Sequence, residues 1–291
     1  MNRERRGLAW GLGAYGLWGL FPLYWPLLDS AGAVELIAHR TVWSLFLMIG
    51  ILATRRQWAW IRGVARSPAV WGRICLASVT LSFNWGVYVY GVNNDRVVEA
   101  ALGFFIAPLV IIGTGVLVLG EKLRPAQSAA VGLGAGAVLV LITAYGRVPW
   151  IALALAGSWA VYAYLKKTVD LPVAQSLTVE SVVMSVPAAG YLVWLAWRGT
   201  GTFFAAGTEH SLLLMTTGLA VTPLLLFAAA ARSVPLSTLG MLQYLEPAMQ
   251  FSIGVVILHE PMPTARWMGF VLVWAALLLL VHDARRSTRT A

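Results

Sequence analysis

The sequence predicts an all-α integral membrane protein of ten transmembrane helices, arranged as two inverted five-helix repeats. Residues of the AVILMFWYC set make up 59% of the 291 residues and charged residues only 11%, whereas soluble domains hold about 25% charged residues. The mean hydropathy is +0.75. The stretch 97–127 recurs at 234–266 in the same frame, with Pro108 matching Pro247. A set of apolar spans that repeats at half the chain length is typical of secondary transporters.

Each predicted helix is an apolar segment of about 20 residues, the length that crosses a hydrocarbon core. In chain order these segments are 8–28, 33–53, 71–92, 97–119, 125–144, 149–165, 177–197, 211–231, 236–258 and 264–282. The connections are short and hold turn-forming residues, such as Asn93-Asn94-Asp95. The first segment is too long for a signal-peptide core and lacks a small-residue cleavage site, so we expect a retained helix. The single cysteine, Cys75, excludes an internal disulfide.

Lysine and arginine are divided unequally between the two sets of connections. Of the 21, Arg40 lies inside a span and 16 lie on the side of both termini. The four on the other side are Arg96, Arg147, Arg198 and Arg266. Because basic connections stay in the cytoplasm, both termini are predicted to be cytoplasmic. Each half has an odd number of spans, so the second repeat (146–291) inserts upside down relative to the first (1–145).

The net charge of +9 follows from this topogenic pattern and does not indicate nucleic acid as a partner. The partners expected are the lipid bilayer and a small-molecule substrate. The chain is expected to act as a monomer or a homodimer.

Prolines and glutamates stand at matching positions of the two halves. Pro108 and Pro247 lack a backbone N–H and are predicted to break their helices. Glu121 and Glu260, at span ends, are predicted to cap or brace helix ends. Glu246 lies beside Pro247 near mid-membrane. It is either a proton-coupling group or a protonated carboxyl that is bonded to a neighbouring helix.

The second span holds three ionisable residues, Glu35, His39 and Arg40. Each such residue costs at least about 2.5 kcal/mol inside a membrane and therefore needs a partner or a function. One hypothesis is that His39 or Arg40 binds a substrate carboxylate, or that His39 carries the coupled proton. The other is a structural ion pair, since Glu35 and His39 are one helical turn apart.

Aromatic pairs occupy corresponding places in the two halves. Tyr15 and Trp18 are three residues apart in the first span, and Trp159 and Tyr162 repeat that spacing in the sixth. They fall near mid-span, where they either line a cavity or pack. Further candidates for a substrate site in the third and ninth spans are Asn84, Tyr88, Gln243 and Tyr244. Asn84 can equally bridge two helices.

Motifs along nearly the whole chain are similar to those of one family. They include Leu17-Trp18-Gly19, Glu35-Leu36-Ile37-Ala38-His39-Arg40, Asn84-Trp85, Leu102-Gly103-Phe104-Phe105-Ile106, Leu119-Gly120-Glu121 and Leu236-Ser237-Thr238-Leu239-Gly240. With these motifs the chain resembles the RarD-type, chloramphenicol-sensitive group of the EamA-domain drug/metabolite transporter superfamily. The resemblance implies ten helices, an inverted repeat and a central cavity. It also implies that the last span of each half lies outside the cavity-forming set.

These observations favour a secondary transporter that exports small metabolites, such as amino acids or amphipathic drug-like solutes, across the bacterial inner membrane by alternating access. The alternatives are a passive facilitator or channel and, in another class, a membrane-embedded enzyme. The sequence has no HExxH, GxSxG or Walker motif. We therefore expect no catalytic residues, no metal, no cofactor and no use of ATP.

The predicted orientation can be tested with single cysteines in a Cys75→Ser background. We expect an impermeant thiol reagent to label, from outside the cell, cysteines at Asp29, Asn94 and Gly201. Cysteines on the predicted cytoplasmic side are expected to stay unlabelled, namely Gln57, Lys167 and Ser287. Outside labelling at position 287 would contradict a ten-span chain with both termini in the cytoplasm.

Overall fold

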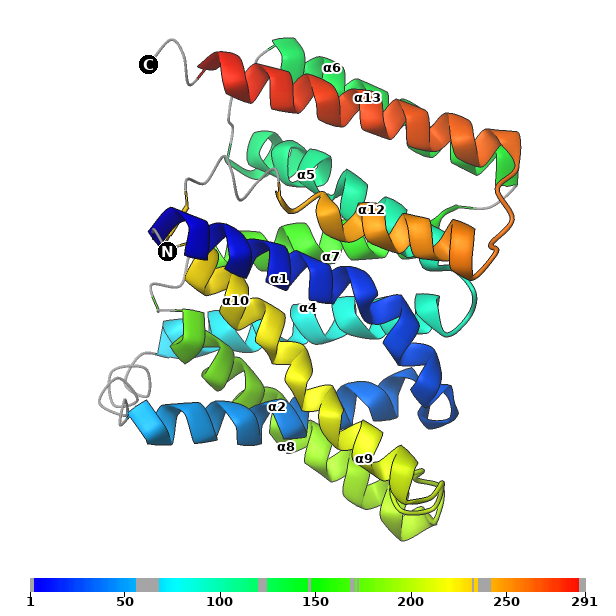
Figure 1. Ribbon diagram of the computed structural model, residues 1–291. Coiled ribbons are helices and arrows are strands. Elements are labelled where there is room, and N and C mark those ends of the chain that lie inside the picture. The colour runs from blue at the N-terminus through cyan, green and yellow to red at the C-terminus, as the bar shows by residue number, and fades with distance from the viewer. Residues whose placement is uncertain are drawn as a thin grey trace.

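Figure 1 shows the computed structural model, in which long helices lie side by side and both termini reach the same end of the bundle. The structure describes residues 3–55, 68–119, 125–145, 148–167, 171, 173–231, 233–234 and 242–287. The regular elements in this part of the chain are all helical, and it contains no strand.

The first half of the chain forms α1 (Arg3–Tyr24), the 3₁₀ segment η1 (Trp25–Ala31), α2 (Gly32–Arg55), α4 (Pro68–Val92), α5 (Val97–Leu119) and α6 (Pro125–Tyr145). The second half forms α7 (Trp150–Lys167), α8 (Val173–Arg198), α9 (Thr208–Thr216), the 3₁₀ segment η2 (Thr217–Val221), α10 (Thr222–Ala231), α12 (Leu245–Ser252), the π-helical η3 (Ile253–Ile257) and α13 (Thr264–Ser287).

Seven stretches of these described residues are long and apolar enough to cross a membrane. The first of them, Arg5–Thr54, contains both α1 and α2. The prediction of an all-helical protein with many apolar helices, consistent with an integral membrane protein, is confirmed. The count of ten spans and their two-repeat arrangement remain predictions.

The segment 211–231, predicted as one helix, is divided into α9, η2 and α10. Pro223 has no N–H to continue the α-helical bonding, and Thr222 donates to the Leu219 carbonyl in the tighter 3₁₀ pattern. At Gly218 the segment meets the backbone of α2, because an added Cβ there would come within 2.7 Å of it. Proline and close packing together account for the difference from the prediction.

The two predicted helix breaks differ in outcome. α5 continues through Pro108, so the predicted break there is wrong. A proline removes only the bond to the carbonyl four residues earlier, and the turns on both sides keep theirs. Pro247 instead lies in the first turn of α12, directly after a turn at Gln243 and Tyr244. Its missing N–H costs little there, because first-turn N–H groups have no partner within the helix.

Helices from the two halves of the chain pack against each other throughout the bundle. α5 packs on α7, α1 on α10 and α2 on α8. The approach of α5 to α7 depends on Gly103, since a Cβ there would lie 2.9 Å from the Ala152 carbonyl oxygen. α6 packs mainly on α13, and this pair runs along one edge, at the top of Figure 1. This edge position agrees with the expectation that the last spans of each half lie outside the central set.

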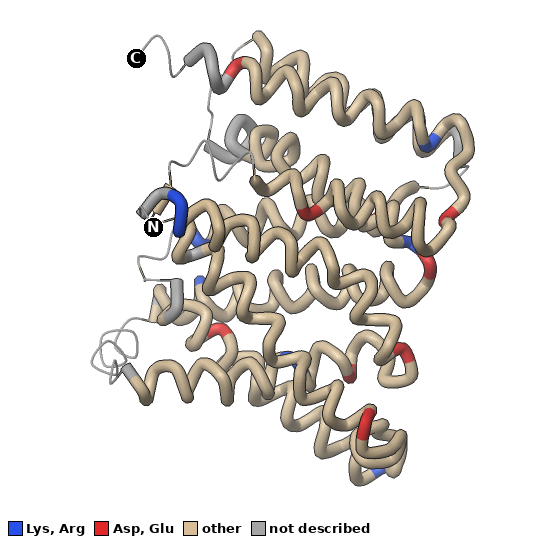
Figure 2. Tube along the Cα trace, in the orientation of Figure 1, with Lys and Arg blue, Asp and Glu red and all other residues tan. Residues whose placement is uncertain are grey.

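Charged residues gather at the two ends of the helices, and the middle of the bundle carries few of them (Figure 2). This distribution suits a bilayer, whose core disfavours charge. Four charged residues are buried among the described residues, namely Glu35, Arg40, Glu180 and Glu260. Each of these must be neutralised or hydrogen-bonded within the protein.

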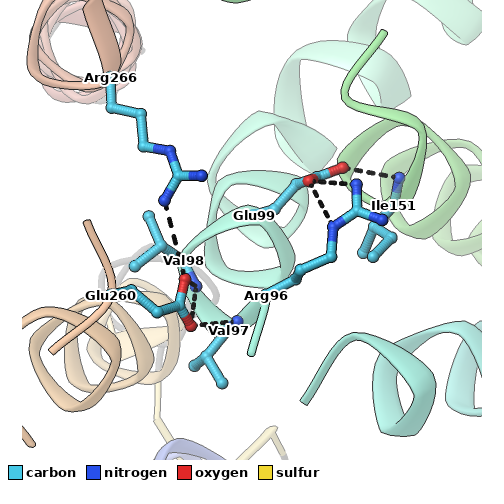
Figure 3. Close-up of polar contacts among 7 residues, drawn as sticks. All are labelled: Arg96, Val97, Val98, Glu99, Ile151, Glu260 and Arg266. Atoms are coloured by element: carbon cyan, nitrogen blue, oxygen red, sulfur yellow. Dashed lines mark hydrogen bonds and ion pairs between the residues drawn. The ribbon is translucent and has the colours of Figure 1, made fainter. Parts of the chain in front are cut away.

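At the end away from the termini, two carboxylates cap helices that belong to other parts of the chain (Figure 3). Glu260 follows η3 and accepts hydrogen bonds from the N–H of Val97, at 2.5 Å, and of Val98, at 3.1 Å, in the first turn of α5. Glu99 accepts from the N–H of Ile151 in the first turn of α7, at 3.1 Å. The first N–H groups of a helix have no partner within the helix, so each carboxyl stabilises the helix start to which it supplies an acceptor. The bracing role predicted for Glu260 is confirmed, while Glu121 lies outside the described residues.

Two arginines complete this cluster. Arg96 donates to Glu99 through Nε, at 3.0 Å, and Nη2, at 2.6 Å. Arg266 Nη1 lies 3.9 Å from Glu260 Oε2 and donates a hydrogen bond to the Pro261 carbonyl. Burial raises the pKa of the Glu260 carboxyl to about 7, although the bonds from the Val98 and Val97 N–H groups act in the opposite direction. The nearby carboxylates Asp95 and Glu99 raise it further.

We predict that the stability of the wild-type protein falls with rising pH relative to a Glu260→Gln variant. A carboxyl whose pKa is raised on folding stabilises the folded state most below its unfolded pKa of 4.5, and this contribution is lost as the pH rises through about 7. Between pH 5 and pH 8 we expect a relative loss of up to roughly 3 kcal/mol. Thermal unfolding of the two purified proteins across this range measures it. Parallel curves would show that Glu260 does not titrate in this way.

Candidate substrate site

The middle of the bundle holds a connected group of rings from α1, α4 and α5. Phe21 lies 5.6 Å from Trp85, Trp85 lies 6.0 Å from Tyr88, and Tyr88 lies 5.6 Å from Phe104, measured between ring centroids. The rings meet edge to face or at a tilt, as aromatic pairs prefer. We call Phe21, Trp85, Tyr88 and Phe104 the central aromatic cluster.

The two predicted aromatic pairs both lie inside the bundle. Tyr15 and Trp18 of α1 are 5.5 Å apart and face Phe227 of α10, at 6.1 Å and 6.2 Å. Trp159 and Tyr162 of α7 are 5.6 Å apart. Tyr15, Trp18 and Tyr162 are buried, and Trp159 is partly buried. Their burial separates these pairs from the aromatic belt that faces lipid at membrane surfaces.

Arg40 of α2 places its guanidinium over the central aromatic cluster. Its Cζ lies 4.0 Å from the centroid of Trp85, and the residue is only 7% exposed. Its Nε has no hydrogen-bond partner. Among the described residues no carboxylate lies within 4.0 Å of Arg40. The ring therefore partly stabilises a buried positive charge that has no anionic partner.

Glu180 of α8 forms a buried network with α7. Its carboxylate accepts hydrogen bonds from Lys166 Nζ at 2.6 Å, Ser176 Oγ at 2.8 Å and Tyr162 Oη at 3.1 Å. Lys166 also donates to Ser176. Each oxygen of Glu180 has a partner, so its charge is compensated inside the protein.

A polar pocket of about 40 Å³ lies between α2, α4, α8 and the η2–α10 segment. Its lining includes polar residues, among them Arg40, Ser82, Glu180 and Ser181, and apolar residues such as Leu224. A water molecule needs about 10–15 Å³ of such space, so the pocket has room for roughly three water-sized groups. In this conformation it can hold the polar end of a solute.

Glu246 connects α12 to α1 through Gln250. The Gln250 amide donates to Glu246 Oε1 at 3.2 Å and to the Trp18 carbonyl at 3.4 Å. Glu246 also interacts electrostatically with Tyr15 and Tyr88. The Tyr88 hydroxyl has no hydrogen-bond partner among the described residues. The bond to Glu246 lies within α12, and Gln250 makes the contact with α1. Both readings of Glu246, a proton carrier and a carboxyl bonded to a neighbouring helix, remain predictions.

His39 belongs to a different cluster, near the end of the bundle away from the termini. Glu35 Oε1 lies 3.9 Å from His39 Nε2 and accepts bonds from Thr202 N–H, at 2.8 Å, and Thr202 Oγ1, at 2.9 Å. His210 Nε2 lies 3.1 Å from the same hydroxyl. The His39 ring packs against Phe203 at 5.0 Å. Although His39 and Arg40 are adjacent in sequence, their side chains therefore lie in different clusters.

The remaining predicted residues are not gathered at the pocket. Asn84 donates to the Leu155 carbonyl at 3.0 Å and to Ser158 Oγ at 2.8 Å, so it bridges α4 to α7. Gln243 and Tyr244 are partly buried in the turn before α12, and Tyr244 packs against a second core around Phe105 and Phe270.

Sequence reasoning missed Glu180, Gln250 and Phe227 as parts of the interior. Glu180 lies close to the start of the predicted span 177–197, a place where a charged residue needs no special partner. The offset of 141 that matches Trp18 with Trp159 also matches His39 with Glu180, and this correspondence was a signal that could have identified it.

Comparisons with known proteins give the chain clear relatives. Residues 5–143 match the model of the EamA-like transporter family. The chain is 54% identical to Protein RarD of Streptomyces exfoliatus over 99% of this chain and 92% of that protein. It is 38% identical to the uncharacterized transporter YojE of Bacillus subtilis over 99% and 97%. It is 35% identical to Protein RarD of Escherichia coli K12 over 99% and 98%.

A solved crystal structure has the same fold, with a TM-score of 0.62, 19% sequence identity, and coverage of 97% of this chain and 99% of that chain. The apolar helices and the bacterial transporter relatives together support a multi-pass protein of the inner membrane. The full-length identity to RarD proteins and the match to the family model lead to one assignment: the chain belongs to the EamA-like transporter family, as a RarD-type member of the drug/metabolite transporter superfamily.

Proposed function

We propose that this chain is a secondary transporter that moves small solutes, such as amino acids or amphipathic drug-like molecules, out of the cell by alternating access. The observation that carries the proposal is the buried Arg40 beside a polar pocket and an aromatic cluster, at the junction of helices from both halves. An ionisable residue in such a place marks a substrate or ion pathway more often than a fold requirement. The family assignment supports transport and not enzymatic chemistry.

We further propose ten spans in two inverted repeats, with both termini in the cytoplasm. The pairing of α1 with α10 and of α5 with α7 supports this, because in inverted-repeat transporters the site lies between the halves. The cluster around Glu260, Glu99 and their arginines links η3, α5, α7 and α13 at the end away from the termini, and we propose that it forms the gate at that end. Alternating access then requires these contacts to open when the opposite end closes.

A passive facilitator is the second candidate, and one observation favours it. Glu246 is hydrogen-bonded to Gln250, as expected if its role is structural. Flux into liposomes, measured with and without a pH gradient over a panel of amino acids and amphipathic drugs, separates the two functions. Uphill accumulation that follows the pH gradient supports coupled transport, and equilibration at the same rate with or without the gradient supports a facilitator.

We predict that Trp18→Ala and Trp159→Ala each weaken the transport of aromatic or amphipathic solutes. A ring packed on a bound solute contributes about 0.5–1.5 kcal/mol beyond its area burial, so the apparent affinity should fall about two- to tenfold. Initial rates of flux over a range of solute concentrations measure the change. Trp197→Ala is a matched control, because Trp197 is 83% exposed. Normal transport by both interior variants would show that their rings only pack.

We predict that Glu246→Gln abolishes accumulation driven by the proton gradient and spares exchange of substrate for substrate. Glutamine keeps the shape and one acceptor of Glu246 but cannot release a proton. His39→Gln is the comparison, because His39 is the other candidate for proton coupling. Full gradient-driven flux in Glu246→Gln would mean that the carboxyl is structural. The same result in both variants would favour facilitated diffusion.

A further inference from the structure

We propose that Arg40 binds a carboxylate of the transported solute in the pocket between α2, α4 and α8. This inference rests on the proposed transport function and narrows the substrate class to small organic acids and amino acids with an apolar side chain. Amines and neutral drugs that lack a carboxylate are then poor substrates.

The first step is the charge of Arg40. Desolvating an ion costs several kcal/mol even after the protein relaxes. The cation–π contact with Trp85, at 4.0 Å, offsets only part of this cost. Arg40 as a whole residue is 7% exposed, and its Nε has no hydrogen-bond partner among the described residues. An anion in the pocket would supply the missing compensation.

The second step is that Glu180 does not serve as this anion, although it lines the same pocket. Its oxygens are held by Lys166, Ser176 and Tyr162. Lys166 Nζ lies 2.6 Å from Glu180 Oε1, so the two opposite charges neutralise each other. Of the two charged residues that line the pocket, Glu180 has an ion-pair partner, and Arg40 has none within 4.0 Å among the described residues.

The third step concerns the hydroxyl groups of the pocket. Thr41, Ser44 and Ser78 donate to backbone carbonyls of Ile37, Gly218 and Ile74. Ser82 and Ser181 also line the pocket, and within the described structure neither hydroxyl makes such a bond. Each can donate to an oxygen of a carboxylate that a forked guanidinium holds.

The fourth step is size and polarity. Space for roughly three water-sized groups suits a planar carboxylate better than a tetrahedral phosphate. Leu81, Leu177, Met184 and Leu224 form the apolar part of the wall. A solute whose carboxylate enters the pocket and whose apolar side chain contacts these residues at its rim matches both parts.

The test uses matched sets of compounds on the purified full-length protein. L-phenylalanine and 3-phenylpropionate carry the carboxylate, phenethylamine lacks it, and phenyl phosphate replaces it. A second set replaces the phenyl group with the side chain of leucine. Thermal stabilisation measures binding, and counterflow in proteoliposomes measures transport. We expect saturable stabilisation by the carboxylates and at least about tenfold weaker binding of phenethylamine, since a hydrogen bond to a charged group is lost.

Variants separate the pocket from general effects on folding. Arg40→Gln is expected to remove the preference for carboxylates, and Arg40→Lys to keep a weaker one, because lysine has the charge without the fork. Ser181→Ala removes one donor and should weaken carboxylate binding several-fold. Ser185→Ala is its matched control one turn further along α8, since Ser185 bonds to the Val182 carbonyl outside the pocket.

The outcomes are distinguishable. Transport of phenethylamine and phenylalanine with equal affinity would overturn the carboxylate site and leave the transport function standing. Preference for phenyl phosphate would also overturn it. Binding by none of the carboxylates, in a protein that still unfolds cooperatively, would reject the site. Absence of any flux over the wider solute panel would instead count against the transport function itself.

Discussion

No water reaches the hydrocarbon core of a bilayer, so each polar group within this bundle must find its partner in the protein. The constraint accounts for the helices, whose backbone groups bond within the same segment. It also accounts for the Lys166–Glu180 pair and for the amide of Asn84 between two helices. Arg40 meets the constraint only in part, through the face of Trp85. The candidate site is thus a consequence of the same rule that organises the fold.

Much of the helical framework could be predicted, because an unbroken apolar run is a property of the sequence alone. The structure differs from the prediction where contacts with other helices determine the local backbone conformation. Residues 211–231 are as apolar as a single span should be, yet the contact of Gly218 with α2 and the proline at position 223 tighten the chain into η2. Pro108 has the chemistry of a helix break, but the bonded turns around it keep α5 continuous.

The sequence allowed the ionisable residues of the candidate site to be predicted, but not the residues that they contact. Arg40 and Glu246 are conspicuous in a sequence because charge is rare inside apolar spans. That Arg40 lies on Trp85 while its neighbour His39 faces Glu35 depends on how α2 crosses α4 and the segment around Thr202. Asn84 was equally suited to a substrate or a helix bridge, and only the position of α7 decides for the bridge. Crossing geometry of this kind is not contained in a single sequence.

The cap on α5 also bears on how the protein is made. Val97 and Glu260 are 163 residues apart, so α5 is synthesised and inserted long before its carboxylate leaves the ribosome. Until then the first N–H groups of α5 lack this partner. The first half of the chain, although predicted to be one unit of a duplication, is therefore not a finished unit of assembly. A nascent chain cut short before position 260 would present the start of α5 without this cap at the membrane surface, as an unassembled subunit exposes the surface that its partner would cover.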